Sequence, residues 1–246
     1  MRGTLFLILF LLAGCTTTGT TVDNKQMAEG YYMKGLAFFQ DKKFELASVE
    51  FHRSIQTDSS HKWSYYYLGI ITDTQDKLDD AIHFYSEAIH QDSDFSEAYN
   101  ALGAVYSRQQ KWKDALAAYH KALANKLYTT PQVPWINIGR VFMAQKKYDQ
   151  AIESYREAKR YSNQDFVIVE LGTALLEAGK TKEAIQEFQE GVGLVPQNAF
   201  MRYNLALAYL KNGNKKSAVS EFRKTAELAP KTDLARKANQ FLKTLR

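Results

Sequence analysis

The chain has 246 residues, of which 45% are apolar and 24% charged, and its formal net charge is +5. A chain of this length and composition can bury a large hydrophobic core. Nucleic-acid binding usually needs clustered basic residues and a stronger positive bias, so we expect no nucleic-acid partner. A single cysteine excludes an intrachain disulfide, so the fold must be stable through packing alone.

Residues 1–14 have the layout of an export signal. Arg2 supplies a positive charge, residues 5–12 are apolar, and small residues lead into Cys15. The apolar run is too short to span a bilayer. The sequence Leu-Ala-Gly-Cys that ends at Cys15 resembles the lipobox of bacterial lipoproteins. This resemblance implies cleavage before Cys15, a diacylglyceryl group on its sulfur and N-acylation. An ordinary signal peptide with an incidental cysteine is the alternative.

Lipidation would also decide where the protein works, because two or three acyl chains anchor a protein lastingly to a membrane. Thr16 follows Cys15, whereas Asp at that place resembles the inner-membrane retention signal of Gram-negative lipoproteins. The resemblance therefore implies a lipid-anchored protein of the outer membrane that faces the periplasm. Residues 15–27 are polar, rich in threonine and without periodicity, so we predict a flexible tether there.

From about residue 28 the chain repeats itself with a period near 34 residues. In each unit a Leu-Gly-like pair is followed by an alanine and then by an aromatic residue; Gly103, Ala115 and Tyr119 illustrate the spacing. This pattern resembles the tetratricopeptide repeat, a pair of antiparallel helices in which small residues allow close approach and the aromatic ring fills the gap beside them. We place six units at 28–61, 62–95, 96–129, 132–164, 165–198 and 199–232.

The resemblance predicts an all-α fold, a right-handed superhelical solenoid of six tetratricopeptide helix pairs. One unit cannot bury its apolar face alone, but a stack of units can. Proline cannot continue a helix, so Pro196 and Pro230 are expected to close the last two units. Residues 233–246 carry apolar side chains at helical spacing and predict a C-terminal capping helix. Two positions depart from the pattern: Lys34 replaces Leu or Ile, and Ala206 replaces Gly.

No motif of a catalytic or metal site stands out. The five histidines are scattered, and His83 and His90, which can share a helix face, have no third ligand nearby in the sequence. The stretch Gly191–Gly193 is too short for a phosphate-binding loop. We therefore expect no enzyme, no catalytic residue, no metal and no cofactor apart from the covalent lipid on Cys15.

In tetratricopeptide folds, positions 2, 5, 9, 12 and 13 of each unit tend to line the concave face. In the first two units these positions hold a dense aromatic and aliphatic stripe, which we predict as the partner-binding groove: Tyr32, Leu36, Phe39, Trp63, Tyr66 and Ile70. Such side chains anchor apolar residues of a partner, and an amphipathic helix fits a groove of this kind. The alternative is that several of them pack against the neighbouring helix as core.

The later units continue this face differently. The third unit contributes Ala104, Ser107 and Arg108, among others, and units four to six contribute mostly apolar side chains such as Ile136, Phe166 and Phe200. Repeats that bind a terminal carboxylate use Lys, Arg and Asn at these positions. Because such residues are few here, we do not expect that type of ligand.

The lipobox, tether, six repeats and total length together resemble the pilotin lipoproteins of type IV pili. The junction 124–131, where Leu127-Tyr128 precedes Pro131, and the opening at 15–19 are also similar. The resemblance implies a non-enzymatic factor that binds secretin subunits, through an apolar or amphipathic segment, and promotes their outer-membrane localisation and multimerisation. Twitching or gliding motility would depend on it. The alternative is a periplasmic adaptor for cell-wall enzymes or for another envelope assembly complex.

Overall fold

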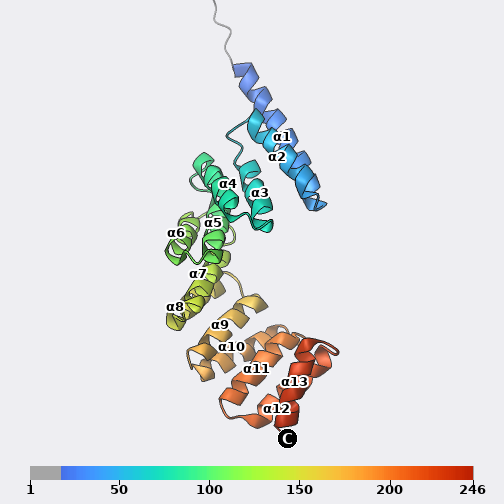
Figure 1. Ribbon diagram of the computed structural model, residues 1–246. Helices are drawn as coiled ribbons and strands as arrows, with labels where there is room; N and C mark the ends of the chain where they lie inside the picture. Colours follow the sequence, from blue (N-terminus) through green and yellow to red (C-terminus); the bar gives the residue numbers. More distant parts are fainter. Residues whose placement is uncertain (1–17, 246) are drawn as a thin grey trace, which may run out of the picture. The chain divides into compact units, whose positions relative to one another are not determined.

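The computed structural model describes residues 18–245, and side chains from residue 23 onward (Figure 1). Cys15, the predicted lipidation site, lies outside this range. The described residues form thirteen α-helices and no strand. The predicted all-α fold of six helix pairs and a C-terminal capping helix is therefore confirmed. The chain divides into two compact units at residues 92 and 93, and each is described by itself.

Unit 1 contains the first two repeats. Its helices are α1 (Thr18–Gln40), α2 (Phe44–Thr57), α3 (Lys62–Thr74) and α4 (Leu78–Gln91). Helix α1 pairs with α2 and α3 pairs with α4, while α2 also packs on α3. The core of the unit is built around four buried side chains: Ala47, Phe51, Leu68 and Ile71.

Unit 2 contains the remaining four repeats and the capping helix. Its helices are α5 (Ser96–Arg108), α6 (Trp112–Ala124), α7 (Gln132–Ala144), α8 (Tyr148–Tyr161), α9 (Asp165–Glu177), α10 (Thr181–Leu194), α11 (Ala199–Lys211), α12 (Lys215–Leu228) and α13 (Asp233–Thr244). The first helices of successive repeats contact one another in the order α5, α7, α9, α11, and α13 then packs on both α11 and α12. Helices α10 and α12 both end two residues before a proline, as expected for Pro196 and Pro230.

In each of the first five repeats, an aromatic ring of the second helix lies against a glycine of the first helix. A Cβ atom added at Gly103 would lie 2.6 Å from a ring carbon of Tyr119, and one added at Gly139 would lie 2.5 Å from Tyr155. The same relationship recurs in three further repeats: Gly35 with Phe51, Gly69 with Tyr85 and Gly172 with Phe188. Since only glycine leaves room for the ring, the repeated Gly and aromatic positions set the distance between the paired helices.

The turn inside each repeat uses one residue in the left-handed region. Four of these residues are not glycine, and their φ values lie between 57° and 62°: Lys42, Asp76, Gln110 and Lys146. In the last two repeats Gly179 and Gly213 take this role. A left-handed residue just after a helix ends the helix and lets the chain reverse into its partner.

The two departures from the repeat pattern lie in the first and the last repeat. Lys34 lies in the first repeat, and its side chain is 54% exposed while its Nζ donates to Glu50 Oε1 at 2.8 Å. No preceding helix pair in the described chain covers this position, so an apolar side chain is not required. Ala206 lies in the last repeat, where the ring of Phe222 stacks on Phe241 of α13, with centroids 4.8 Å apart.

Part of the predicted tether is helical, which corrects the expectation of a flexible chain over 15–27. Helix α1 begins at Thr18, although residues 23–27 are all exposed and Ala28 is the first buried side chain in the described range. Extending an existing helix adds one hydrogen bond per residue without a new nucleation cost. The packed part of α1 therefore supports a helical extension through the exposed residues 23–27.

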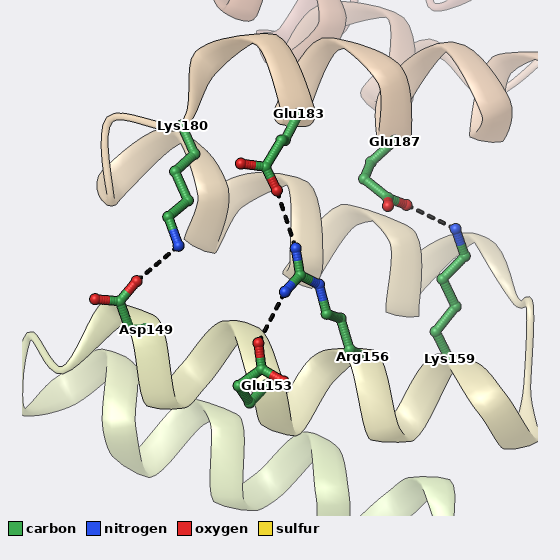
Figure 2. A network of polar contacts seen from close by, with 7 residues as sticks. All are labelled: Asp149, Glu153, Arg156, Lys159, Lys180, Glu183 and Glu187. Atoms are coloured by element: carbon green, nitrogen blue, oxygen red, sulfur yellow. Dashed lines mark hydrogen bonds and ion pairs between the residues drawn. The ribbon is translucent and has the colours of Figure 1, made fainter.

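Ion pairs join the second helices of the fourth and fifth repeats (Figure 2). Lys159 on α8 donates to Glu187 on α10 at 2.7 Å and to Glu190 at 2.9 Å. Arg156 bridges Glu153 and Glu183, and Lys180 pairs with Asp149, all within 2.9 Å. The network neutralises the cations of this surface by pairing them across two repeats.

Candidate partner-binding surface

The six predicted groove residues all lie in unit 1 on the first helices of its two repeats. Tyr32, Leu36 and Phe39 follow one side of α1, and Trp63, Tyr66 and Ile70 follow one side of α3. Every one of them is half-buried. Spacings of three, four and seven residues keep each set on one helix face. The two sets are therefore similarly buried, but they pack against different residues.

The α1 set belongs largely to the core. Tyr32, Leu36 and Phe39 all pack against the buried cluster of unit 1. The ring of Phe39 lies 5.4 Å from that of Phe44, and the ring of Tyr32 lies 6.0 Å from that of Phe51. For these three residues the alternative of packing against the neighbouring helix is the better description.

The α3 set lies outside that buried cluster. The rings of Trp63 and Tyr66 are nearly perpendicular, with centroids 5.8 Å apart, and Tyr66 also contacts Tyr85. Together with Ile70 one turn further on, they form a half-exposed surface that we name the aromatic face: Trp63, Tyr66 and Ile70. Rigid aromatic side chains of this kind bury much apolar area with little loss of conformational entropy, so they suit a partner's apolar residues.

Tyr67 joins the two sets, and sequence reasoning missed it. Its ring lies 5.1 Å from Phe39, 6.0 Å from Tyr32 and 5.6 Å from Tyr66, and it stacks on Phe51 at 5.4 Å. Tyr67 occupies position 6 of its repeat, which the family's list of concave positions omits. The spacing of four residues from Trp63 on one helix is the signal that would have found it. Tyr67 thus packs between the aromatic face, through Tyr66, and the core of unit 1, through Phe51.

The polar side chains of His61 and Glu29 lie close to Tyr32. His61 Nδ1 accepts a hydrogen bond from the backbone N–H of Ser64 at 3.2 Å, and its Nε2 lies 3.1 Å from a carboxylate oxygen of Glu29. The ring of His61 contacts that of Tyr32 at 4.8 Å. Burial, with smaller effects of Tyr67 and Glu29, raises the pKa of Tyr32 to about 12. The Tyr32 hydroxyl therefore stays protonated near neutral pH and remains a hydrogen-bond donor.

Unit 2 has a cavity of its own, which is lined by residues of α5, α6 and α7. The cavity has a volume of about 320 Å³ and is lined by the expected Ala104, Ser107 and Arg108. Five further residues complete its wall: Trp112, Tyr119, Asn137, Arg140 and Val141. The Ser107 and Tyr119 hydroxyl groups lie 3.1 Å apart, and burial raises the pKa of Tyr119. The wall thus combines apolar surface with several hydrogen-bonding groups.

The apolar residues that we expected on the concave face of unit 2 differ in exposure. Phe166 and Phe200 are exposed, at 41% and 52%, as concave-face residues should be. Ile136, in contrast, is buried in the core of unit 2, which corrects its assignment to the groove. Asn137 was not among the expected residues and donates to Asn100 Oδ1 at 3.1 Å, whereas Arg140, at the expected position 9 of its unit, makes two hydrogen bonds to Glu170. Glu170 thus already neutralises one cation beside this cavity.

The described residues contain neither a cluster of metal ligands nor a membrane-spanning helix. In residues 18–245 no three His, Cys, Asp or Glu side chains are grouped so that they could hold a metal ion. Across the same part of the chain, no helix is both long and apolar enough to cross a membrane.

Comparison with family models agrees with the geometry of the helix pairs. Models described as tetratricopeptide repeat match residues 96–124, 134–165 and 169–232, which together make up about half of the chain. The chain belongs to the tetratricopeptide-repeat family. None of the matched models is a catalytic family, and repeats of this family present surfaces to partner proteins.

Several solved structures of the family share the fold. PilF of Pseudomonas aeruginosa superposes with a TM-score of 0.73 at 21% identity, covering 89% of this chain and 99% of PilF. PilW, a type IV pilus biogenesis factor, gives a TM-score of 0.75 at 16% identity, covering 87% and 99%. YrrB, a repeat protein with an unusual peptide-binding site, gives 0.61 at 22% identity, covering 77% and 97%. Comparison with curated protein sequences gives no match. At these identities the likeness establishes the fold.

Proposed function

We propose that this protein is a non-enzymatic pilotin lipoprotein. It binds subunits of the type IV pilus secretin through an apolar or amphipathic segment and promotes their localisation and multimerisation in the outer membrane. The aromatic face of α3 is the observation that carries the proposal. The similarity in fold to PilF and PilW, and the resemblance of Cys15 and its neighbours to a lipobox, support it.

The aromatic face supplies what a temporary hold on a secretin segment needs. Trp63, Tyr66 and Ile70 are half-buried, so they are fixed in place while part of each side chain stays available. An apolar segment that will be buried between subunits of the final ring is exposed before assembly and tends to aggregate. Binding to the aromatic face would cover that segment until the ring forms.

A lipid on Cys15 would complete the mechanism. The anchor confines the protein, and any bound subunit, to the outer membrane where the ring assembles. Confinement raises the effective concentration of captured subunits without any new contact between them. On this proposal the lipid sets the place and the aromatic face holds the client.

The aromatic face is tested by Trp63→Ala and Ile70→Ser, with Tyr161→Ala as the control. Tyr161 is an exposed aromatic residue of unit 2, so its loss removes a comparable side chain elsewhere. Each face variant should weaken binding of the purified secretin subunit by roughly tenfold or more, as expected for an anchor residue. In cells, secretin multimers in the outer membrane should fall accordingly. Normal binding and multimers in both face variants would refute the role of the aromatic face.

The anchor is tested separately by Cys15→Ala. The variant should carry no lipid by mass spectrometry and should leave the outer-membrane fraction, while the purified domain still binds secretin. Unchanged fractionation would contradict lipidation at Cys15.

Pull-down of the native protein from solubilised envelopes distinguishes the proposal from its alternative. Secretin in the eluate supports a pilotin. A cell-wall hydrolase in the eluate without secretin would overturn the proposal and favour the adaptor.

A further inference from the structure

The last repeat and the capping helix are far more basic than the rest of the chain. Residues 199–246 contain eleven Lys and Arg but three Asp and Glu, a net charge of +8. The other 198 residues contain 21 Lys and Arg and 24 Asp and Glu, a net charge of −3. The overall charge of +5 therefore hides a concentrated positive end.

Part of this charge lines a groove beside α12 and the end of α13. The groove has a volume of about 630 Å³ and is lined by four cationic side chains, one carboxylate, one hydroxyl and two apolar side chains: Lys215, Lys216, Arg223, Lys224, Glu227, Ser220, Val219 and Leu245. A smaller space of about 150 Å³ extends it, lined by Val219, Arg223, Leu242 and Leu245. Four cationic side chains and one carboxylate thus surround the apolar Val219 and Leu245. We name this site the basic groove.

Three of the four cations of the basic groove have no carboxylate of the described chain within ion-pair distance. Among the described residues, Lys215, Lys216 and Arg223 form no ion pair, whereas Lys224 pairs with Glu221 at 2.9 Å. On α8 and α10, by comparison, the cations drawn in Figure 2 are each matched by a carboxylate. With four cations against one carboxylate, Glu227, the basic groove keeps an excess of positive charge that can attract an external anion.

Two of these cations also lie at the unfavourable end of their helix. Lys215 and Lys216 form the first turn of α12, which contains no acidic residue. The helix dipole favours anions at this end and disfavours cations. The N-cap is already satisfied, since the Asn214 side chain accepts a hydrogen bond from the Ser217 N–H at 3.1 Å. The two lysines therefore gain no stability from the helix dipole.

We propose that the basic groove binds an acidic, amphipathic segment of a partner protein. Carboxylates of the segment would pair with Lys215, Lys216 and Arg223, while one of its apolar side chains would cover Val219 and Leu245. A small anion would leave these two apolar side chains uncovered, and a flat membrane surface would not fill a groove. The site lies in unit 2, whereas the aromatic face lies in unit 1, so this proposal stands apart from the proposed function.

Fluorescence anisotropy with labelled helix-forming peptides tests the proposal on the full mature chain. The probe peptide carries Glu on one face and Leu on the other; one control replaces Glu with Gln, and a second replaces Leu with Ser. The probe should bind more tightly than both controls, and its affinity should fall as NaCl is raised, because exposed charges are screened by salt. Equal binding of all three peptides, or none, would overturn the proposal.

Matched variants locate the site. The triple variant Lys215→Gln, Lys216→Gln, Arg223→Gln should lose roughly tenfold or more in affinity for the probe peptide. The control Lys113→Gln, Lys121→Gln, Lys126→Gln removes the same charge from exposed positions of unit 2 and should change affinity by less than about twofold. Equal losses in the two variants would show a non-specific charge effect and refute the site.

Two further arms separate the remaining outcomes. Val219→Ser should weaken binding of the probe peptide but not of the peptide that carries Ser in place of Leu. Vesicles of phosphatidylcholine with phosphatidylglycerol serve as an anionic surface without an acidic peptide. Binding of the vesicles that depends on Lys215, Lys216 and Arg223, without binding of the probe peptide, would overturn the proposal in favour of a membrane contact. Circular dichroism of each variant verifies its folding.

Discussion

The ring of Phe241 lies parallel to that of Phe222, with centroids 4.8 Å apart and planes inclined by 5°. This contact joins the capping helix α13 to the core of the last repeat, where Phe222 is fully buried. Tyr203 packs edge-on against the same Phe222 ring at 5.6 Å. Because α13 covers what would otherwise be an open apolar end, the stability of the last repeat depends on this stack.

Phe241→Ala should therefore destabilise unit 2. Truncation of a buried phenylalanine costs about 3–5 kcal/mol, and since Phe241 is only half-buried we expect about 2–3 kcal/mol. Urea unfolding followed by circular dichroism measures the change. Lys237→Ala on the exposed side of α13 is the control and should shift stability by less than about 0.5 kcal/mol. A Phe241→Ala variant as stable as this control would contradict a capping role for α13.

The contact between Gly103 and Tyr119 leads to a second prediction. An added methyl group at Gly103 would meet the Tyr119 ring at 2.6 Å, so Gly103→Ala should force the helix pair apart and cost about 1–3 kcal/mol. Gly30 lies within α1 with nothing within 4 Å of an added Cβ. Gly30→Ala should instead stabilise by about 0.5–1 kcal/mol, because alanine is the better helix former. Thermal unfolding of both variants measures the opposite signs, and the same sign in both would refute the steric explanation.

The sequence was sufficient to predict the helix pairs because their determinants recur at fixed local spacings. Gly103 and Tyr119 lie sixteen residues apart in one repeat, and the same spacing returns in other repeats. A capping helix was also predictable, since the apolar side chains of 233–246 follow the helical period. These features depend on short-range geometry, which a single sequence contains in full.

The candidate site was less predictable, because it depends on burial within a particular stack. The family's concave positions do not distinguish Phe39, which packs on the buried cluster around Phe51, from Trp63, which lies outside that cluster. The family's positions also place Ile136 in the groove although it is buried, and they omit Tyr67, which contacts four other rings. How far each first helix is covered by its neighbours decides these outcomes, and spacing along one chain does not report that coverage.

The pair formed by Lys34 and Glu50 predicts acid sensitivity of unit 1. Glu50 is only 4% exposed, and its Oε1 accepts hydrogen bonds from Lys34 at 2.8 Å and Arg53 at 3.0 Å. The hydrogen bond from Lys34 is the main cause that lowers the pKa of Glu50; burial opposes it, and the charge of Arg53 adds to the lowering. The ionised form is therefore favoured in the folded state. Its contribution to stability is complete above the ordinary glutamate pKa of about 4.3 and is lost as the pH falls through the lowered folded value.

Lys34→Leu tests this assignment, because it restores the apolar residue of the repeat pattern and leaves Glu50 with Arg53 alone. The free energy of unfolding should fall by about 1–2 kcal/mol near neutral pH, less than for a fully buried pair because Lys34 is half exposed. Below about pH 4.3 the wild-type protein should lose stability faster than the variant, so the two curves should converge. Urea unfolding of both proteins at several pH values between about pH 3 and pH 7 measures their free energies of unfolding. Parallel curves would show that Lys34 does not determine the pKa of Glu50.

The network of Figure 2 predicts that cations of one surface differ in their effect on stability. Burial alone would lower the pKa of Lys159, but its hydrogen bonds to Glu187 and Glu190 outweigh burial and raise the pKa. Lys159 is therefore charged, and its contribution is complete, at every pH below the ordinary lysine value of about 10.4. Lys180 has one partner, Asp149, and both side chains are exposed to water.

Lys159→Met keeps most of the aliphatic stem and removes the charge that links α8 to α10. At low ionic strength it should lower the free energy of unfolding by about 1 kcal/mol, whereas Lys180→Met should have no measurable effect. At 1 M NaCl the Debye length is about 3 Å, so part of the Lys159 contribution should disappear. Between about pH 6 and pH 9 lysine stays charged. The difference in free energy of unfolding between the wild-type protein and Lys159→Met should therefore not change with pH in this range. Equal effects of the two substitutions would contradict the prediction, because they would show that partial burial and a second carboxylate add nothing to an ion pair on this surface.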